Sequence, residues 1–366
     1  MRLLLVNANR FKQPWPVIPF GLCCVAAAVE SAGHQVTILD LCFSPDPAAQ
    51  LQEAITTFLP DVIGVGIRNI DNGTGCNTRF LLDDTLREVI SPIKRHFSGP
   101  IVIGGAAVGI SGREMLHFFD LPYALTGDGE EGMVLFLRQL AEGRTPSGIG
   151  GLIVRRNGTI VEENEPLRVG NLDRLLPAKP QRYLDLAPYR RFGSSLQIQT
   201  KRGCALRCSY CTYRRIEGES YRLRNPEQLA HEVATLVAET GISQIEIVDS
   251  TFNLPLDHCK EVLRALIALN VSLQLKAMGL SPAAVDEELV TLLKTAGFRE
   301  VGLGVESASP VTLRSLGKGF GRKEILRAGE LLHQGGIPVS WYLLVGAPGE
   351  TRQTLADTFD TISAAA

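Results

Sequence analysis

The sequence is short of net charge and of long apolar runs. Its 366 residues hold 37 lysines and arginines against 39 aspartates and glutamates, which gives a formal net charge of −2. A strongly basic domain, the usual sign of nucleic-acid binding, is therefore missing. No run approaches the roughly 18 apolar residues of a membrane-spanning helix, and the apolar run at 3–6 is too short for a signal peptide. We expect a cytoplasmic protein with reduced thiols that neither binds nucleic acid nor spans a membrane.

The paired cysteines of a structural zinc site are also missing. Cys204, Cys208 and Cys211 form a C-x3-C-x2-C run, but no second cysteine pair or histidine pair follows it. The other cysteines stand apart from this run: Cys23, Cys24, Cys42, Cys76 and Cys259. Three thiolates on one loop can hold three corners of a cubane iron-sulfur cluster and leave one iron open to another ligand. Zinc binding and unliganded core cysteines are the alternatives, and the spacing favours the cluster.

Short apolar runs alternate with helical patterns over residues 1–145. The predicted strands span 3–6, 36–39, 62–65, 101–103 and 123–125. The predicted helices span 21–32, 48–59, 83–97 and 112–119. This alternation predicts an α/β, Rossmann-like domain with a doubly wound parallel sheet. Such folds bind ligands outside the carboxyl ends of their strands.

Small and polar residues collect directly after these strands. They are Asn7, Asn9, Arg68, Asn69, Gly104, Gly105, Gly127, Gly129 and Glu130. Glycine at a strand end lets the backbone approach a bulky ligand without a side chain in between. On these loops alone, the alternative that the glycines only shape turns stays open.

A hairpin and linker at 146–190 precede a second domain at 191–366. Asn157-Gly158 between apolar runs predicts the hairpin turn, and the proline-rich stretch 176–180 predicts an extended linker. The second domain has predicted strands at 196–200, 244–248, 272–277, 301–305 and 340–345, and predicted helices at 225–241, 257–269, 284–296, 322–334 and 350–363. We expect a partial parallel barrel whose active face lies at the carboxyl ends of its strands.

Cys204, Cys208, Tyr210 and Cys211 resemble the C-x3-C-x-aromatic-C loop of the radical S-adenosylmethionine (SAM) enzymes. The resemblance implies a 4Fe-4S cluster whose open iron binds the amino and carboxylate groups of SAM. It also implies that an electron from the cluster cleaves a carbon-sulfur bond to give a 5'-deoxyadenosyl radical. Barrels of this family usually have six strand-helix units, whereas this sequence supplies five. We expect either a C-terminal truncation or a natural absence of the sixth unit.

The same resemblance implies contacts with SAM in the cysteine loop and after the later strands. The residues are Tyr210, Asp249, Ser250, Glu306, Ser307, Gly346 and Pro348. Carboxylates suit an ammonium group or ribose hydroxyls, while glycine and proline can shape a wall for adenine. Glu306 could instead be a charge at a helix N-terminus, and Lys318 could be a solvated loop cation. Both alternatives stay open.

Residues 1–145 are similar to the cobalamin-binding domain that precedes the cluster domain in one class of these enzymes. The similarity is carried by the segments 102–105 and 127–130, and it implies that the strand-end residues named above contact cobalamin. None of the six histidines lies in an Asp-x-His-x-x-Gly motif, so we expect cobalt without a histidine beneath it. We hypothesise that Arg68 lies on this lower side, where a cation would disfavour axial ligation. A solvated arginine is the alternative.

With both cofactors, the resemblance implies a cobalamin-dependent (class B) radical SAM methyltransferase. Its substrate would be a carbon atom of a small molecule or natural product, and an external donor such as flavodoxin or ferredoxin would supply electrons. A first alternative is an enzyme of the same family that cyclises, rearranges or oxidises without net methylation. A second is a tRNA methylthiotransferase, although the remaining cysteines lack the second trio that such enzymes carry. A third is a non-catalytic, cofactor-binding fragment.

Overall fold

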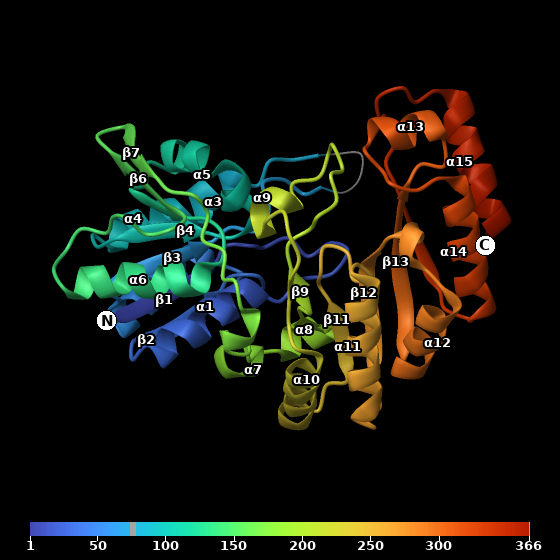
Figure 1. Cartoon of the computed structure of the whole chain (residues 1–366). Helices are drawn as coiled ribbons and strands as arrows, with labels where there is room; N and C mark the ends of the chain where they lie inside the picture. Colours follow the sequence, from blue (N-terminus) through green and yellow to red (C-terminus); the bar gives the residue numbers. More distant parts are fainter. Residues whose placement is uncertain (74–77, 366) are drawn as a thin grey trace. The chain divides into compact units, whose positions relative to one another are not determined.

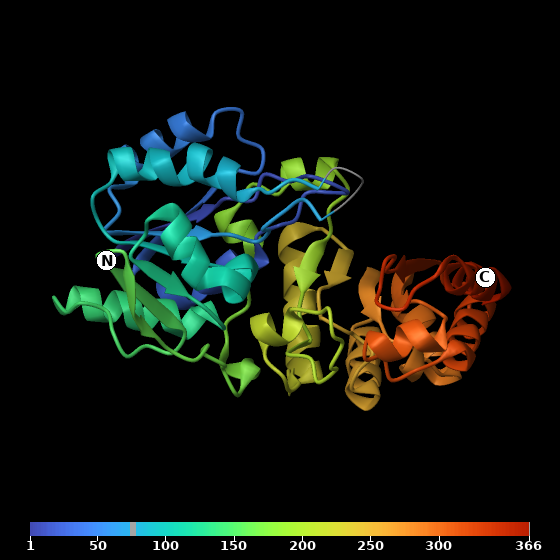
Figure 2. The same cartoon turned by 90° about the horizontal axis from the view of Figure 1, so that it is seen from above.

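The computed structural model describes residues 1–73 and 78–365, so Cys76 lies outside the described part of the chain. The chain divides into two compact units (Figures 1 and 2). The first comprises Met1–Gly170 and Arg174–Ser194, and the second comprises Asn171–Asp173 and Ser195–Ala366. In the described residues, no helix is long and apolar enough to cross a membrane.

The first unit is built on a seven-stranded sheet in the order β2-β1-β3-β4-β5-β6-β7. Its strands are β1 (Arg2–Asn7), β2 (Gln35–Asp40), β3 (Val62–Gly66), β4 (Ile101–Gly104), β5 (Tyr123–Leu125), β6 (Leu152–Arg156) and β7 (Thr159–Glu163). The first five strands pair in parallel, whereas β6 and β7 pair antiparallel. The predicted doubly wound sheet is confirmed, and the hairpin extends it at the β5 edge.

Helices cover both faces of this sheet. They are α1 (Phe20–Ser31), α2 (Pro47–Phe58), α3 (Leu82–Thr85), the π-helical turn η1 (Leu86–Ile90), α4 (Ser91–His96), α5 (Ala106–Phe119) and α6 (Gly129–Ala141). The helix predicted at 83–97 is thus interrupted by a π turn. The helix predicted at 112–119 begins earlier, at Ala106. Ser111 breaks α5 with a non-helical φ of −139°, so the sequence pattern revealed only the part that follows this kink.

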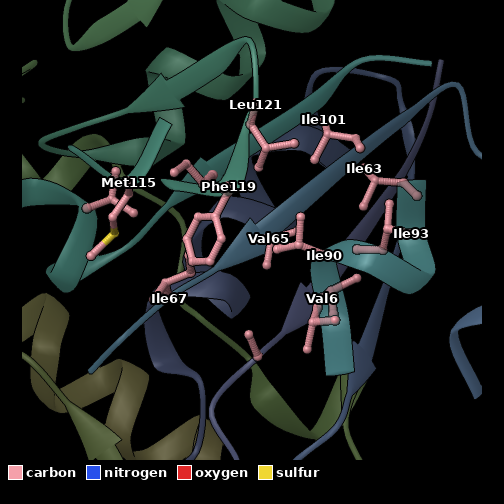
Figure 3. Close-up of a cluster of buried hydrophobic side chains, with 14 of the residues drawn as sticks. Val6, Ile63, Val65, Ile67, Ile90, Ile93, Ile101, Met115, Phe119 and Leu121 are labelled. Atoms are coloured by element: carbon pink, nitrogen blue, oxygen red, sulfur yellow. The ribbon is translucent and has the colours of Figure 1, made fainter. Parts of the chain in front are cut away.

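Two apolar clusters form the core, one on each face of the sheet. Successive strand residues point to opposite faces of the sheet. Leu4 and Val6 therefore join a cluster with residues of helices α2, α4 and α5, and Figure 3 shows part of this cluster. Leu3 and Leu5 join a second cluster with helices α1 and α6. Full burial of one such side chain contributes about 1.5–3 kcal/mol.

The segment that follows the sheet is tied back onto the first unit. It contains the short helices α7 (Pro180–Tyr183) and α8 (Ala187–Arg191), whereas most of the preceding turn η2 (Leu172–Arg174) belongs to the second unit. The buried Tyr189 donates a hydrogen bond of 2.7 Å to Asp40 Oδ2, and Ser194 Oγ donates one of 2.6 Å to the Pro16 carbonyl. Arg182 also pairs with Glu30. The chain that follows the proline-rich stretch is therefore anchored to the first unit by side-chain contacts.

The second unit is an open, fully parallel five-stranded sheet in the order β14-β13-β12-β11-β8. Its strands are β8 (Leu196–Ile198), β11 (Gln244–Ile247), β12 (Gln274–Leu280), β13 (Phe298–Glu306) and β14 (Val339–Leu343). The connecting helices are α10 (Pro226–Thr240), α11 (Leu256–Ala268), α12 (Glu287–Ala296), α14 (Arg322–Gln334) and α15 (Arg352–Ala365). Strands that pair in this sheet also follow one another as its successive strands along the chain. This order confirms the predicted partial barrel.

Short elements decorate the strand ends of this barrel. They are β9 (Lys201–Arg202), α9 (Tyr213–Glu217), β10 (Arg222–Leu223), η3 (Pro282–Ala284) and α13 (Pro310–Ser315). The first barrel helix, α10, begins as the sequence predicts. The Asn225 side chain accepts hydrogen bonds from the Glu227 and Gln228 amides at 2.9 and 3.0 Å, and Gly241 ends the helix with a φ of 66°.

Gly151 should be far less tolerant of a side chain than Gly143. Both have a positive φ, of 77° and 72°, but a Cβ on Gly151 would lie 2.1 Å from the Thr126 carbonyl oxygen, whereas none of the described atoms lies within 4 Å at Gly143. We expect Gly143→Ala to cost about 1–2 kcal/mol from backbone strain, and Gly151→Ala to cost about 3 kcal/mol or more. Urea denaturation of the two variants measures the difference. Equal costs would contradict this account of the β5–β6 junction.

Candidate cluster and cofactor sites

The cysteine loop begins at the carboxyl end of β8, directly after the short strand β9. Gly203, which precedes Cys204, has a φ of 90°, and a Cβ there would lie 2.0 Å from the Ser220 carbonyl oxygen. Only glycine fits this close approach. The Cys204 amide then donates a hydrogen bond of 3.1 Å to the Gly218 carbonyl. The start of the loop is therefore fixed by backbone contacts.

The second half of the loop rests on the chain that follows α13. The Ser209 amide donates to the Leu316 carbonyl at 3.0 Å, and Ser209 Oγ donates to the Ser315 carbonyl at 3.1 Å. Gly317 has a φ of 70°, and a Cβ there would lie 2.7 Å from the Arg207 carbonyl oxygen. The cysteine loop is thus held at both ends by residues distant in sequence.

The three cysteines are free thiols in a partly desolvated loop. Cys204 is buried, and Cys208 and Cys211 are half-buried. Burial raises the pKa of both Cys208 and Cys211, and the charge of Lys318 acts in the opposite direction on each. The neighbouring thiols also raise these pKa values: Cys204 and Cys211 act on Cys208, and Cys204 acts on Cys211. The donor set therefore fits a group with three thiolate ligands.

The described residues show no cluster of side chains arranged for a single metal ion. In residues 1–73 and 78–365, no three cysteine, histidine or acidic side chains converge on one point. A single ion needs all its ligands around one centre, whereas a cubane cluster places each thiolate on a different iron. The cysteine loop suits the second arrangement.

A buried ion pair lies at the strand ends from which the loop departs. Lys201 Nζ lies 3.1 Å from Asp249 Oδ2, and both side chains are almost fully buried. Asp249 Oδ1 accepts a hydrogen bond of 2.8 Å from the Thr200 amide, and Ser250 Oγ donates one of 3.2 Å to the Gly203 carbonyl. Asp249 and Ser250 therefore position the first residues of the loop. Their contacts with SAM stay a prediction.

Glu217 is a second carboxylate in this region. Its side chain accepts hydrogen bonds from Gln199 Nε2 at 3.0 Å and from the Gly203 amide at 3.3 Å. Burial, reinforced by the charge of Asp249, raises the pKa of Glu217 to about 7. Glu217 lies in no sequence motif, so its position at the loop emerges only from the fold.

Glu306, at the end of β13, has one engaged and one free carboxylate oxygen. Its φ is 58°, an uncommon conformation for a residue with a side chain. Oε1 accepts hydrogen bonds from the Tyr210 hydroxyl and, at 3.1 Å, from Lys318 Nζ. Oε2 is buried and has no hydrogen-bond partner among the described residues. A buried free acceptor beside the cysteine loop is suited to a ligand that donates a hydrogen bond.

Lys318 is the ion-pair partner of Glu306, and the sequence did not reveal this contact. Its side chain is only 8% exposed, so the interpretation as a solvated loop cation is wrong. Its neighbour Tyr210 has a pKa raised by burial and then by its hydrogen bond to Glu306. The signal available in the sequence was weak, since Lys318 follows a glycine in an unpatterned loop.

The other residues predicted to contact SAM have local partners. Ser307 is fully buried, and its hydroxyl lies 3.2 Å from Thr358 Oγ1 in α15. The Gly346 amide donates to the Glu350 carboxylate at 2.6 Å, and the Pro348 carbonyl accepts from Ser315 Oγ at 2.8 Å. The structure thus brings Tyr210 and Glu306 together, whereas the Ser307 hydroxyl is engaged with α15. Contacts of these residues with SAM stay predictions.

A cavity of about 240 Å³ opens at the carboxyl ends of β1 and β3 in the first unit. Cationic, acidic and amide side chains line it, together with apolar ones: Ala8, Asn9, Arg10, Phe11, Lys12, Cys42, Ile67, Arg68, Asn69, Arg79, Leu81, Asp84, Thr85, Glu88 and Val89. Three of the predicted cobalamin residues, Asn9, Arg68 and Asn69, are therefore brought together, and Arg68 Nη1 donates to Asn69 Oδ1 at 3.1 Å. No histidine occurs among these described lining residues.

The other predicted cobalamin residues have structural explanations. Asn7 is buried, and its amide nitrogen donates to Asp40 Oδ1 at 2.8 Å. A Cβ on Gly105 would lie 2.6 Å from the Ile67 carbonyl oxygen, and one on Gly127 would lie 2.3 Å from that of Leu167. Close approach of protein backbone thus accounts for these two glycines. The remaining positions, none of which lines the cavity, are Gly104, Gly129 and the buried Glu130. Contacts with cobalamin stay predictions.

Two family profiles match the chain in the order in which its two units occur. The B12 binding domain matches residues 9–137, and the radical SAM superfamily matches residues 198–362. Both matches fall on the folds described above.

The whole chain is also similar to characterised proteins. It is 26% identical to tryptophan 2-C-methyltransferase from Streptomyces laurentii, over 97% of this chain and 69% of the relative. It is 24% identical to anaerobic magnesium-protoporphyrin IX monomethyl ester cyclase from a Synechocystis species, over 92% and 67%.

Solved structures of one methyltransferase share the fold of the whole chain. Two structures of the radical SAM methyltransferase TsrM from Kitasatospora setae superpose with a TM-score of 0.89 at 28% identity, covering 100% of this chain and 71% or 70% of TsrM. One contains tryptophan and the SAM analogue aza-SAM, and the other contains cobalamin and a 4Fe-4S cluster. With the paired profiles and the free cysteine loop, these similarities show that the chain belongs to the cobalamin-dependent radical SAM enzymes, whose cofactors are cobalamin, a 4Fe-4S cluster and SAM.

Proposed function

We propose that the protein transfers a methyl group from SAM to a carbon atom of a small molecule. The observation that carries this proposal is the presence, on one chain, of a three-cysteine loop and a B12-binding unit. The similarity to a tryptophan methyltransferase over 97% of the chain supports methylation. An external protein such as flavodoxin or ferredoxin would deliver the electrons.

The residues of the second unit would bind and orient SAM. When bound, the cluster supplies the electron that opens SAM, and cobalamin carries the methyl group. Cys204, Cys208 and Cys211 hold the cluster. The free Glu306 Oε2 accepts a hydrogen bond from an ammonium or hydroxyl group of SAM. Asp249 holds the start of the loop in place through its contacts with Thr200 and Lys201, which follow β8.

The first unit would hold cobalamin at the carboxyl ends of its strands. The cavity beside Asn9, Arg68 and Asn69 supplies amide and guanidinium donors and contains no histidine among its described lining residues. We infer that Arg68 would lie against the bound cobalamin, where its charge would disfavour a further ligand to cobalt and would weaken the trivalent state relative to the monovalent one.

A second candidate function is cyclisation without net methylation. The similarity to an anaerobic cyclase over 92% of the chain favours it. The two functions differ in the fate of the SAM methyl group, because only methylation places that group in the product. A tRNA methylthiotransferase is disfavoured, because Cys23, Cys24, Cys42 and Cys76 do not have the sequence spacing of a second cysteine trio.

The proposed function predicts that the protein consumes SAM only with its cluster in place. The full chain, reconstituted anaerobically with iron, sulfide and cobalamin, should release S-adenosylhomocysteine from methyl-labelled SAM under reducing conditions, and this release should require cobalamin. The variant with all three loop cysteines changed to alanine should release none. Formation of 5'-deoxyadenosine without S-adenosylhomocysteine would favour cyclisation. The enzyme assignment would be overturned if folded, reconstituted protein gave neither product.

Gly203→Ala should reduce cluster content several-fold, because the new Cβ would collide with the Ser220 carbonyl and displace Cys204. Gly241→Ala is the matched control, since its φ of 66° is also positive but none of the described atoms lies within 4 Å of the new Cβ. Iron and sulfide analysis after reconstitution measures the effect. If both variants bind as much iron as the parent protein, the backbone of Gly203 does not position the loop.

Arg68→Ala should change the behaviour of bound cobalamin. Loss of the cation should make an added axial ligand bind more readily and shift the reduction potential of cobalt in the negative direction. Absorption spectra during a redox titration report both changes. Arg95→Ala, which alters an exposed arginine in α4 away from the cavity, is the control. If the Arg68 variant behaves like this control, Arg68 does not face cobalt.

A further inference from the structure

Lys318 is held at the corner formed by the cysteine loop and the end of β13. Its Nζ lies 3.1 Å from Glu306 Oε1, 5.4 Å from the centre of the Tyr210 ring and 5.7 Å from that of Phe320. A lysine ammonium that gives up water must find other partners. One carboxylate and two aromatic faces replace that water here. The ammonium therefore has a defined position.

The backbone beside Lys318 keeps it in this position. The Lys318 amide donates a hydrogen bond of 2.9 Å to the Leu313 carbonyl at the end of α13. The preceding Gly317 lies against the Arg207 backbone, and Leu316 accepts the Ser209 amide. A movement of Lys318 away from the corner would disturb the same contacts that hold the cysteine loop.

Lys318 lies beside the part of the loop that carries two of the cysteines. Its Nζ is 5.4 Å from the centre of the ring of Tyr210, which stands between Cys208 and Cys211 in the sequence. The backbone two residues before Lys318 accepts the Ser209 amide of the same loop. A cluster bound to three thiolates gains negative charge when it is reduced, so a nearby cation favours the reduced form.

We propose that Lys318 is a positioning residue of the cluster site. It holds Glu306 by one oxygen so that the other stays available to SAM, and its charge raises the reduction potential of the cluster. This inference rests on the proposed function only in requiring that the cluster forms.

The test is the midpoint potential of the reconstituted cluster, measured by a redox titration followed by electron paramagnetic resonance in the absence of SAM. We expect Lys318→Met to shift the potential in the negative direction and Lys318→Arg to leave it close to that of the parent protein. Glu306→Gln should shift it in the positive direction, because the acid is lost while the lysine stays. A merely structural role would not give shifts of opposite sign.

Lys260→Met is the matched control. Lys260 is also a mostly buried lysine of the second unit, and its Nζ lies 2.7 Å from both Asp286 and Glu288. Its partners lie at the start of α12 and not in the cysteine loop, so this variant should leave the potential unchanged. Circular dichroism confirms that each variant is folded.

Three results would overturn the proposal. They are an unchanged potential in Lys318→Met, a shift no larger than that of Lys260→Met, and shifts of the same sign in Lys318→Met and Glu306→Gln. If Lys318→Met does not fold, an unchanged potential in Glu306→Gln decides against the proposal. A parent protein that forms no cluster counts against the proposed function as well, whereas an intact cluster with unchanged potentials contradicts the role of Lys318 alone.

Discussion

The cluster site depends on the buried ion pair between Lys201 and Asp249. Both side chains are removed from water, and loss of either partner would leave the other charge unpaired, at a cost of about 3–5 kcal/mol. The pair joins the chain that follows β8 to the end of β11, because Asp249 also accepts the Thr200 amide. Gly203 and the cysteines continue directly from this point. The position of the first ligand therefore follows from a contact between adjacent parallel strands.

The second half of the cysteine loop is held in place by the chain that follows β13. The carbonyls of Ser315 and Leu316 accept the hydrogen bonds of Ser209. Gly317 has no side chain and so allows the Arg207 backbone to approach closely. Lys318 then lies over the Tyr210 ring. Glu306 reaches the same corner through its left-handed backbone conformation, where the pairing of β13 with β14 shifts register. Strained residues persist where the surrounding structure determines them, and such places are often functional. The free Glu306 oxygen lies at one of them.

Much of the fold could be read from local patterns. The strands of both units are short apolar runs, and α10 carries its capping residue, proline and terminal glycine in sequence. The pattern failed where the backbone departs from regular geometry. Ser111 breaks α5, and the π-helical turn at Leu86–Ile90 changes which residues of the predicted helix 83–97 share a face. Residues of that turn line the cavity of the first unit, so the irregular segment lies at the candidate cofactor site.

The sequence by itself determined the chemistry of the cluster loop, because three thiols within eight residues remain close in any compact fold. It also indicated the order of the two units and the strand ends at which ligands are predicted to bind. Only the tertiary structure decided that Lys318 is buried, that Glu306 keeps one oxygen free, and that Arg68 shares a cavity with Asn9. The reason is physical: spacing constrains neighbours along the chain, whereas contacts between residues about a hundred positions apart depend on strand order and register.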